Sequence, residues 1–336
     1  RETLDGILNQ KTNFKYDVIV HDDASTDHTA EIVKEYEKKY PDIIRGIYQQ
    51  TNQFYNCNIS AKYLYPQIKG KYFAVLDGDD YWIDENKLQM QVDFLEKHPD
   101  YSMCMHNAIK FNNETGEKKV LNTFPKDGTY TQEEQILAGL GSNFPACASN
   151  LFRTQFIKDI PKLFCESRVM DYPIRQYYAN MGKVYYFEKP MSVYRVSSYM
   201  KMVGEDQSFY NNYTLEMIRF FEKFNDYTEN RFQNILEKKI NSDYYGYCVS
   251  IPKEQGIKKA AEYGLNIQKI EKYYKNIDYK NIDNSILELN KNVDYLFIYG
   301  TSRLATICYK QLENEGIEFA GYVVSDGQMK MDEIDH

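Results

Sequence analysis

Three aspartates stand almost together in the stretch YFAVLDGDDYW, residues 72–82. Asp77, Asp79 and Asp80 follow the apolar run 72–76, which is typical of a strand buried on both faces. Carboxylates gathered at such a strand end repel one another and lose solvation when covered. In an extended chain Asp77 and Asp79 point to the same side, where they could bind Mn²⁺ or Mg²⁺ together with substrate phosphates. We therefore expect a metal site at this strand end.

Other interpretations of this stretch fit less well. A calcium-binding loop would need glycine at its sixth position, which is Trp82 when counted from Asp77. A haloacid-dehalogenase motif would need Thr or Val where Tyr81 stands. A merely solvated acidic turn is the remaining alternative, and the aromatic neighbours Phe73 and Trp82 do not favour it.

Two further aspartate groups could contribute to the same chemistry. Asp22 and Asp23 lie just past a strand end in HDDASTD, and a carboxylate there can accept the N–H of a nucleobase such as uracil. The alternative is a turn that caps the next helix. Asp171 begins a later helix and could remove the proton of an attacking hydroxyl, or act only as a helix cap.

Composition limits the class of protein. The 336 residues suffice for two domains, and the formal charge of −8 argues against a nucleic-acid partner. The six cysteines are scattered without a C-x-x-C pair, which suits reduced thiols in a cytoplasmic protein. No apolar run approaches the roughly 18 residues of a membrane span, and we expect no signal peptide because the opening residues lack its pattern. We expect a cytoplasmic location, with association at the inner face of the membrane as an alternative.

The order of expected elements indicates an α/β fold. Strands near 16–20, 43–50, 72–76 and 101–111 alternate with helices, and strands near 147–153 and 184–196 flank a helix over 170–182. This alternation predicts a mostly parallel central sheet with ligands at the carboxyl ends of its strands.

The second half of the chain differs in pattern. Residues 205–292 have helical periodicity, as in the series Leu215, Ile218, Phe221 and Phe224, and predict a helical linker or packing region. Residues 293–336 predict a partial Rossmann-like βαβ unit. Gly300 matches its first glycine, but Ser302 and Ala305 replace the other two, so an interaction module is as well supported as dinucleotide binding.

The acidic motifs together resemble glycosyltransferase family 2, a family of inverting enzymes with the GT-A (nucleotide-diphospho-sugar transferase) fold. The matching residues are LNQKTNFKYDVIVHDDASTDHTAEIV, then TNQ at 51–53, then GKYFAVLDGDDYWIDENKLQMQVDFLEKHP. The resemblance covers a first domain that we place at 1–204. It implies a further strand upstream of Arg1, because the family's first strand precedes a helix like the one that opens this sequence.

The resemblance also implies roles for individual residues. Asp23, with Asp22 beside it, matches the acid that contacts the base, and Asn52 falls near the nucleotide. Asp77 and Asp79 match the pair at the ribose and at the metal of the diphosphate, followed by Asp80 with a less defined role.

Farther along the chain, the match is less complete. Asp171 matches the general base, with Met170 where the family often has Glu. The family often places a metal-proximal histidine after Tyr-Arg, but this chain has Ser197 nearby, so Glu205 or Asp206 could complete the site instead. The widely spaced residues His21, His98 and His106 fit ordinary hydrogen-bonding roles better than metal binding.

The resemblance implies a metal-dependent inverting transferase, with Mn²⁺ or Mg²⁺ as cofactor and a UDP-sugar as donor. The expected acceptor is a hydroxyl group of a surface glycan or of a lipid-linked saccharide. Two alternatives remain: a sugar-1-phosphate nucleotidyltransferase, and a non-catalytic module that binds nucleotides or glycans.

Overall fold

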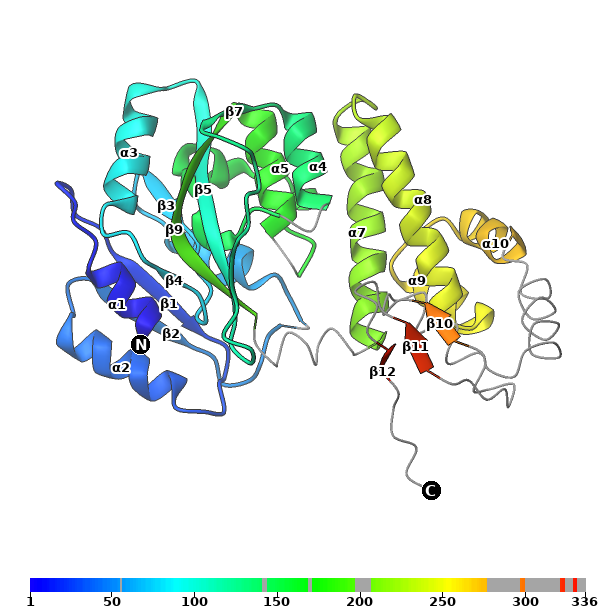
Figure 1. Cartoon of the computed structure of the whole chain (residues 1–336), viewed down its shortest axis with the longest axis horizontal. Coiled ribbons are helices and arrows are strands. Elements are labelled where there is room, and N and C mark those ends of the chain that lie inside the picture. The colour runs from blue at the N-terminus through cyan, green and yellow to red at the C-terminus, as the bar shows by residue number, and fades with distance from the viewer. Residues whose placement is uncertain are drawn as a thin grey trace. The chain divides into compact units, whose positions relative to one another are not determined.

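A computed structural model describes residues 1–54, 56–140, 144–168, 171–196 and 207–276, together with three short strands at 297–299, 321–323 and 329–330. The chain divides into two units, Arg1–Glu205 and Asp206–His336 (Figure 1). Each unit is described by itself below. The finer division at 204 and 292 that the sequence suggests stays a prediction.

The first unit alternates helices and strands. Its α-helices are α1 (Glu2–Leu8), α2 (Thr29–Lys39), α3 (Lys87–Lys97), α4 (Gln132–Leu140) and α5 (Asp171–Met181). Its strands are β1 (Val18–Asp22), β2 (Ile44–Tyr48), β3 (Tyr72–Ala74), β4 (Tyr81–Trp82), β5 (Tyr101–Asn112), β6 (Lys118–Val120), β7 (Gly128–Tyr130), β8 (Leu151–Arg153) and β9 (Lys183–Val196). Short π or 3₁₀ helices lie at Ser60–Leu64, Tyr65–Gln67, Cys147–Ser149, Thr154–Asp159 and Lys162–Phe164. The predicted α/β fold is confirmed.

The larger sheet has the strand order β3-β8-β5-β9-β4, with β6 beside β5 and β7 beside β9. Within it β5 and β9 run parallel, whereas the other described pairs are antiparallel. A separate parallel pair joins β1 to β2. The expectation of a mostly parallel sheet is therefore wrong for the larger sheet. The connection from β5 to β6 shows why: a tight turn closed by Gly116 N–H and Asn112 O (2.9 Å) reverses the chain without a helical crossover.

Strand β3 is also shorter than the expected strand at 72–76. Phe73 is buried, but Tyr72 and Ala74 are only half-buried, so the strand has one fully covered face instead of two. The Tyr72 hydroxyl accepts a hydrogen bond from Arg153 of the neighbouring strand (3.2 Å). The acidic residues that follow β3 are thus presented by a short strand next to β8.

Helices cover both faces of the larger sheet, with α3 on one side and α4 and α5 on the other (Figure 1). The alternation of side chains along β8 produces this arrangement. Leu151 packs in a cluster with Leu88 and Leu95 of α3, whereas the ring of Phe152 contacts Tyr178 of α5 at 4.7 Å between centroids.

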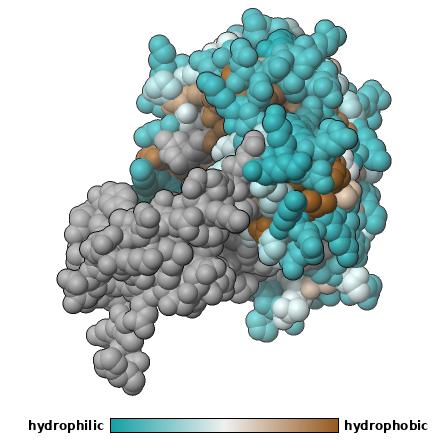
Figure 2. Space-filling model, turned by 90° about the vertical axis from the view of Figure 1, so that its right-hand side faces the viewer, coloured by the Kyte–Doolittle hydropathy of each residue, from teal (hydrophilic) through white to brown (hydrophobic). Residues whose placement is uncertain are grey.

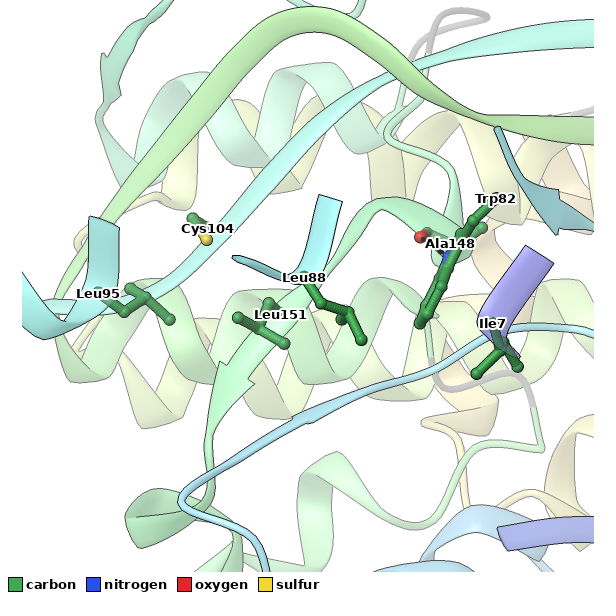
Figure 3. Packing of buried hydrophobic residues seen from close by; sticks show 7 residues of the cluster. All are labelled: Ile7, Trp82, Leu88, Leu95, Cys104, Ala148 and Leu151. Carbon is green, nitrogen blue, oxygen red and sulfur yellow. Dashed lines mark hydrogen bonds between the residues drawn. The ribbon is translucent and has the colours of Figure 1, made fainter. Parts of the chain in front are cut away.

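One hydrophobic cluster reaches from the sheet to the first helix. In Figure 3 its side chains follow one another from Leu95 past Leu151 and Leu88 to Trp82 and Ile7. Helix α1 approaches β4 closely at Gly6, where a Cβ atom would lie 2.7 Å from the carbonyl oxygen of Trp82. This packing fixes the segment that directly follows the three aspartates.

The second unit contains four described helices, α7 (Gln207–Tyr227), α8 (Gln233–Ser250), α9 (Lys253–Glu262) and α10 (Ile267–Asn276). Leu215, Ile218, Phe221 and Phe224 are each fully buried, as their spacing predicts for one helix face. In the space-filling view the coloured residues are mostly hydrophilic, with hydrophobic residues between them (Figure 2). The expected helical character is confirmed over 207–276.

The last strands are β10 (Phe297–Tyr299), β11 (Gly321–Val323) and β12 (Met329–Lys330). β10 and β11 run parallel, as the first and last strands of a βαβ unit would, and β12 is antiparallel to β11. Gly300, Ser302 and Ala305, which carried the expectation of a Rossmann turn, lie outside the described residues. Within the described part of the chain, no helix combines the length and apolar character that a membrane span requires.

Candidate functional site

The three aspartates after β3 lie in a tight turn. The Asp80 N–H donates to the carbonyl oxygen of Asp77 (3.1 Å) and closes the turn. The Thr3 hydroxyl of α1 donates to the carbonyl oxygen of Gly78 (2.8 Å) and holds the turn from outside. Asp77 and Asp79 keep exposed surface, whereas Asp80 is only 1% exposed. The turn thus separates two solvent-accessible carboxylates from a buried one.

Asp80 anchors this turn to the end of β9. Its Oδ1 atom accepts the backbone N–H of Arg195 (2.9 Å), while its Oδ2 atom is buried without a hydrogen-bond partner. Burial raises the pKa of Asp80 to about 7; the charges of Asp79 and Asp171 add to the rise, and the Arg195 N–H opposes it. A buried carboxylate oxygen without a partner is an exception among buried polar atoms, and a bound cation or donor group would satisfy it.

Asp171 lies beside Asp77 at the first position of α5. One carboxylate oxygen of each and the sulfur of Cys147 lie within 4.8 Å of one another. Cys147 belongs to the 3₁₀ helix before β8 and is 7% exposed. Burial, followed by the charges of Asp171 and Asp77, raises the pKa of its thiol well above the ordinary value.

The clustered charges change how Asp77 titrates. Loss of solvation and the charges of Asp171, Asp80 and Asp79 together raise the pKa of Asp77 to about 8. The side chain keeps exposed surface, so an ion from solvent can reach the group of carboxylates. Mutual repulsion of this kind is relieved when a cation binds.

Two aromatic residues border the carboxylates. The phenol of Tyr194 has a pKa raised to about 12, first by burial and then by the charges of Asp80, Asp171 and the other two carboxylates. Its ring meets Phe144 edge-on, with 5.4 Å between centroids. Both residues are half-buried, and Phe144 supports the Tyr194 ring that lies near the carboxylates.

Arg195 supplies positive charge near the turn. Its guanidinium lies 4.7 Å from the centre of the Tyr81 ring and forms an ion pair with Glu2 of α1. Its Nε atom is buried without a hydrogen-bond partner. The sequence pattern predicts no role for Arg195 or Cys147, because single Arg and Cys residues carry no local pattern that singles them out.

The residues expected at the nucleotide form a second group, at the carboxyl end of β1. The Asp23 carboxylate accepts the backbone N–H groups of Gln53 (2.8 and 3.0 Å) and Phe54 (3.1 Å). The Asn52 side chain donates to the carbonyl oxygen of Asp23 (3.2 Å). Asp22 is 5% exposed, and its Oδ1 atom has no hydrogen-bond partner. Asp23 therefore fastens the loop that carries Asn52.

Local backbone geometry supports the same loop. Ala24 directly follows Asp23 and has a left-handed backbone with φ of 59°. Residues other than glycine adopt this region only at a free-energy cost, which the surrounding contacts of Asp23 must offset. The loop conformation is thus imposed by its contacts and not by the preference of Ala24.

The histidines have the ordinary roles expected for them. His106 is buried, and its Nδ1 atom contacts the carbonyl oxygen of Asn107 (2.7 Å). His21 stacks on the ring of Tyr63, with 5.2 Å between centroids. Four residues discussed for the base and for the replaced metal-proximal histidine lie outside the described residues: Met170, Ser197, Glu205 and Asp206.

Comparisons with known proteins agree with these features. Residues 1–160 match the family model described as "Glycosyl transferase family 2". An uncharacterized protein of Mycobacterium tuberculosis, Rv1520, is 35% identical over 196 residues, which cover 58% of this chain and 54% of that protein. EpsE of Bacillus subtilis, provisionally named a glycosyltransferase, is 34% identical over 129 residues, 38% of this chain and 45% of that protein.

Other similarities are more limited. TuaG of Bacillus subtilis, provisionally named a teichuronic acid biosynthesis glycosyltransferase, is 31% identical over 94 residues, 28% of this chain and 35% of that protein. Mannosyltransferase PcManGT of Pyrobaculum calidifontis, solved with GDP-Man and Mn²⁺, is 14% identical with a TM-score of 0.45, covering 78% of this chain and 69% of that one. That structural likeness is too low to carry an argument.

The chain spans about half the length of the M. tuberculosis and EpsE relatives that it matches. The matched segment contains the Asp23 loop and the turn at 77–80, and its helices and strands form the predicted α/β fold. Residues 1–160 of this chain are a glycosyltransferase family 2 domain.

Proposed function

We propose that this chain transfers a sugar from a nucleotide donor, a UDP-sugar, to a hydroxyl group, with inversion at the anomeric carbon. The observation that carries the proposal is the convergence of Asp77 and Asp171 beside the exposed carboxylate of Asp79. A divalent cation and a general base must lie on either side of one anomeric carbon in such a reaction. Inversion requires no protein nucleophile.

The acidic turn fits a divalent metal. Asp79 and Asp77 would hold Mn²⁺ or Mg²⁺, because both ions prefer carboxylate oxygens and keep exchangeable positions for phosphate oxygens. The unpartnered Oδ2 atom of Asp80 and the repulsion that raises the pKa of Asp77 support a missing positive charge here. The bound ion would neutralise charge that develops on the leaving diphosphate.

The loop at Asp23 would take the nucleoside part of the donor. Two backbone N–H groups, with that of Gln53 shared between both oxygens, use part of the roughly four lone-pair positions of the Asp23 carboxylate, and the remaining capacity suits one N–H of a base. Asn52 and the buried Asp22 would stand beside it. The choice of uridine rests on the family resemblance.

Asp171 would remove the proton of the acceptor hydroxyl as that oxygen attacks. The Cys147 sulfur lies within 4.8 Å of an oxygen of this carboxylate. The name of TuaG supports an acceptor in cell-surface glycan synthesis, either a growing glycan or a lipid-linked saccharide. The expected cytoplasmic location stays a prediction.

The test is incubation of the chain with UDP-sugars and GDP-sugars and Mn²⁺, first without and then with saccharide acceptors, while the released nucleoside diphosphate is measured. Slow metal-dependent release of UDP, accelerated by an acceptor, would support the proposal. Release of GDP alone would support sugar transfer and indicate a GDP-sugar, instead of a UDP-sugar, as the donor.

Two outcomes would favour the alternatives. Formation of UTP from a UDP-sugar and pyrophosphate would indicate a nucleotidyltransferase. Binding of UDP without turnover of any donor, measured by calorimetry on the same preparation, would indicate a non-catalytic module.

A further inference from the structure

Three side chains from three separate segments meet beside the proposed base. Asp77 comes from the turn after β3, Cys147 from the 3₁₀ helix before β8, and Asp171 from the start of α5. The Cys147 sulfur and one carboxylate oxygen of each aspartate lie within 4.8 Å of one another. Mn²⁺ and Mg²⁺ prefer oxygen ligands, so a site for these ions explains the two carboxylates but not the thiol.

Positive charge near this trio comes from the Arg175 guanidinium of α5, which opposes the rise in the pKa of the Cys147 thiol, and from Arg195 near Asp80. Asp80, beside it, is 1% exposed and has an Oδ2 atom without a partner. None of the ion pairs within the described residues involves Asp77, Asp80 or Asp171. Burial, followed by the charges of Asp171 and Asp77, raises the pKa of the Cys147 thiol well above its ordinary value. The Cys147 sulfur thus lies beside two carboxylates that no described ion pair neutralises.

The spacing suits a small tetrahedral cation. With metal–sulfur and metal–oxygen distances near 2.3 and 2.0 Å, tetrahedral ligand atoms lie roughly 3.5 Å apart. Ligand atoms that already lie within 4.8 Å need only side-chain adjustments to reach this spacing. Asp77 keeps exposed surface, which gives an ion and a fourth, water ligand a route from solvent.

We propose that Asp77, Cys147 and Asp171 form a binding site for a thiophilic divalent cation, Zn²⁺ or Cd²⁺, which shares Asp77 with the proposed sugar-donor metal site and adds Cys147 and Asp171 as ligands. On binding, the S–H bond of Cys147 breaks, its proton passes to the buffer, and a sulfur–metal bond forms. One thiolate and two carboxylates then surround the doubly charged ion, an arrangement of three protein ligands that leaves one position for water.

Occupation of this site has a consequence that rests on the proposed function. Asp171 cannot accept a proton from the sugar acceptor while its oxygen binds a metal ion. Zn²⁺ at this site therefore inhibits transfer, even in the presence of saturating Mn²⁺, because thiolate-containing sites select Zn²⁺ over Mn²⁺.

The direct test is titration of the chelator-treated, reduced chain with Cd²⁺ while the thiolate-to-metal charge-transfer absorption in the ultraviolet is recorded. One equivalent of Cd²⁺ should produce the band in the wild type and in Cys57→Ser. Cys57 is a half-buried thiol and serves as the matched control. Cys147→Ser should lose the band and at least tenfold in Cd²⁺ affinity.

Two further variants keep the test decisive if Cys147→Ser does not fold. Asp77→Asn and Asp171→Asn retain the thiol and should each weaken Cd²⁺ binding at least tenfold. An unchanged band in Cys147→Ser, or the lack of a stoichiometric band in the wild type, would overturn the proposal.

The two proposals fail separately. Cd²⁺ binding through Cys147 in a chain that transfers no sugar would leave the thiophilic site standing and remove the proposed function. If the chain transfers sugar, shows no charge-transfer band and is not inhibited by Zn²⁺, the thiophilic site is wrong and the proposed function stands.

Discussion

The indole nitrogen of Trp82 donates a hydrogen bond to the carbonyl oxygen of Ala148 (3.0 Å). This contact joins two parts of the candidate site, because Trp82 lies two residues after Asp80 and Ala148 directly follows Cys147. Both residues are buried in the cluster that also holds Ile7. The single tryptophan of the chain therefore positions the acidic turn and the thiol segment relative to each other.

Trp82→Phe should destabilise the first unit and lower its activity. The substitution leaves the Ala148 carbonyl oxygen buried without its donor, which costs about 1–3 kcal/mol in the free energy of unfolding, and it leaves unfilled space in the core. Urea unfolding measures the first effect. As a control, Ile7→Val in the same cluster should cost about 1 kcal/mol and spare sugar transfer. Equal losses of transfer in both variants would contradict the positioning role.

Asp171→Asn and Asp79→Asn should both abolish most sugar transfer for different reasons. Loss of the base lowers turnover by a factor on the order of 10²–10⁴, while UDP still binds with Mn²⁺. Asp79→Asn should weaken the Mn²⁺-dependent binding of UDP itself. Calorimetry with UDP and Mn²⁺ separates the two cases, and the exposed Asp42→Asn is the control. Wild-type turnover in Asp171→Asn would refute the base assignment.

Ala24→Gly should stabilise the first unit by up to about 1 kcal/mol. The left-handed backbone of Ala24 (φ 59°) is unfavourable for an L-residue and free of strain for glycine, although glycine loses more chain entropy on folding. Thermal or urea unfolding measures the change. Ala30→Gly within α2 should have the opposite sign and cost about 1 kcal/mol. Destabilisation by both substitutions would show that the loop adopts another conformation.

Lys87→Met should change the pH dependence of stability. Burial lowers the pKa of Lys87 from 10.5 to about 7. Between these pH values the unfolded chain holds a proton on Lys87 that the folded chain lacks. Burying Lys87 therefore lowers the free energy of unfolding most below about pH 7, and this cost vanishes near pH 10.5. The substitution removes that penalty.

The expected result is a stability difference, variant minus wild type, that falls by about 1.4 kcal/mol per pH unit across this window. Lys87→Met also deprives the Gln91 oxygen of its donor (2.8 Å), which lowers the difference equally at every pH. Urea unfolding at several pH values supplies the comparison. A difference that does not vary with pH would indicate that the amine is charged in the folded chain.

The sequence was sufficient for the features that depend on local pattern. The spacing of Leu215, Ile218, Phe221 and Phe224 predicts one buried helix face because helical periodicity is a property of neighbouring residues. Strand direction is different, since periodicity is the same in parallel and antiparallel ladders. The antiparallel pairing of β3 with β8 therefore could not be read from the sequence.

In the candidate site too, local pattern predicted some features and not others. Asp171 was expected at the start of a helix, and it is the first residue of α5. Its approach to Asp77 and Cys147 depends on contacts between segments far apart in the chain, which no local pattern records. Cys147 has no neighbouring cysteine or histidine that would have marked it as a ligand.

The hydrogen bond from Arg195 to Asp80 spans 115 positions of the chain. A fragment that folds by itself must therefore be long enough to contain both residues. β9, which ends at Val196, pairs with β4, β5 and β7. A truncation at residue 160, where the family match ends, would remove this strand and α5 together. It would leave β5 with an open edge and Asp80 without its backbone anchor. An expression fragment designed on the match alone should therefore aggregate, whereas one extended past Val196 retains the strands that close the sheet.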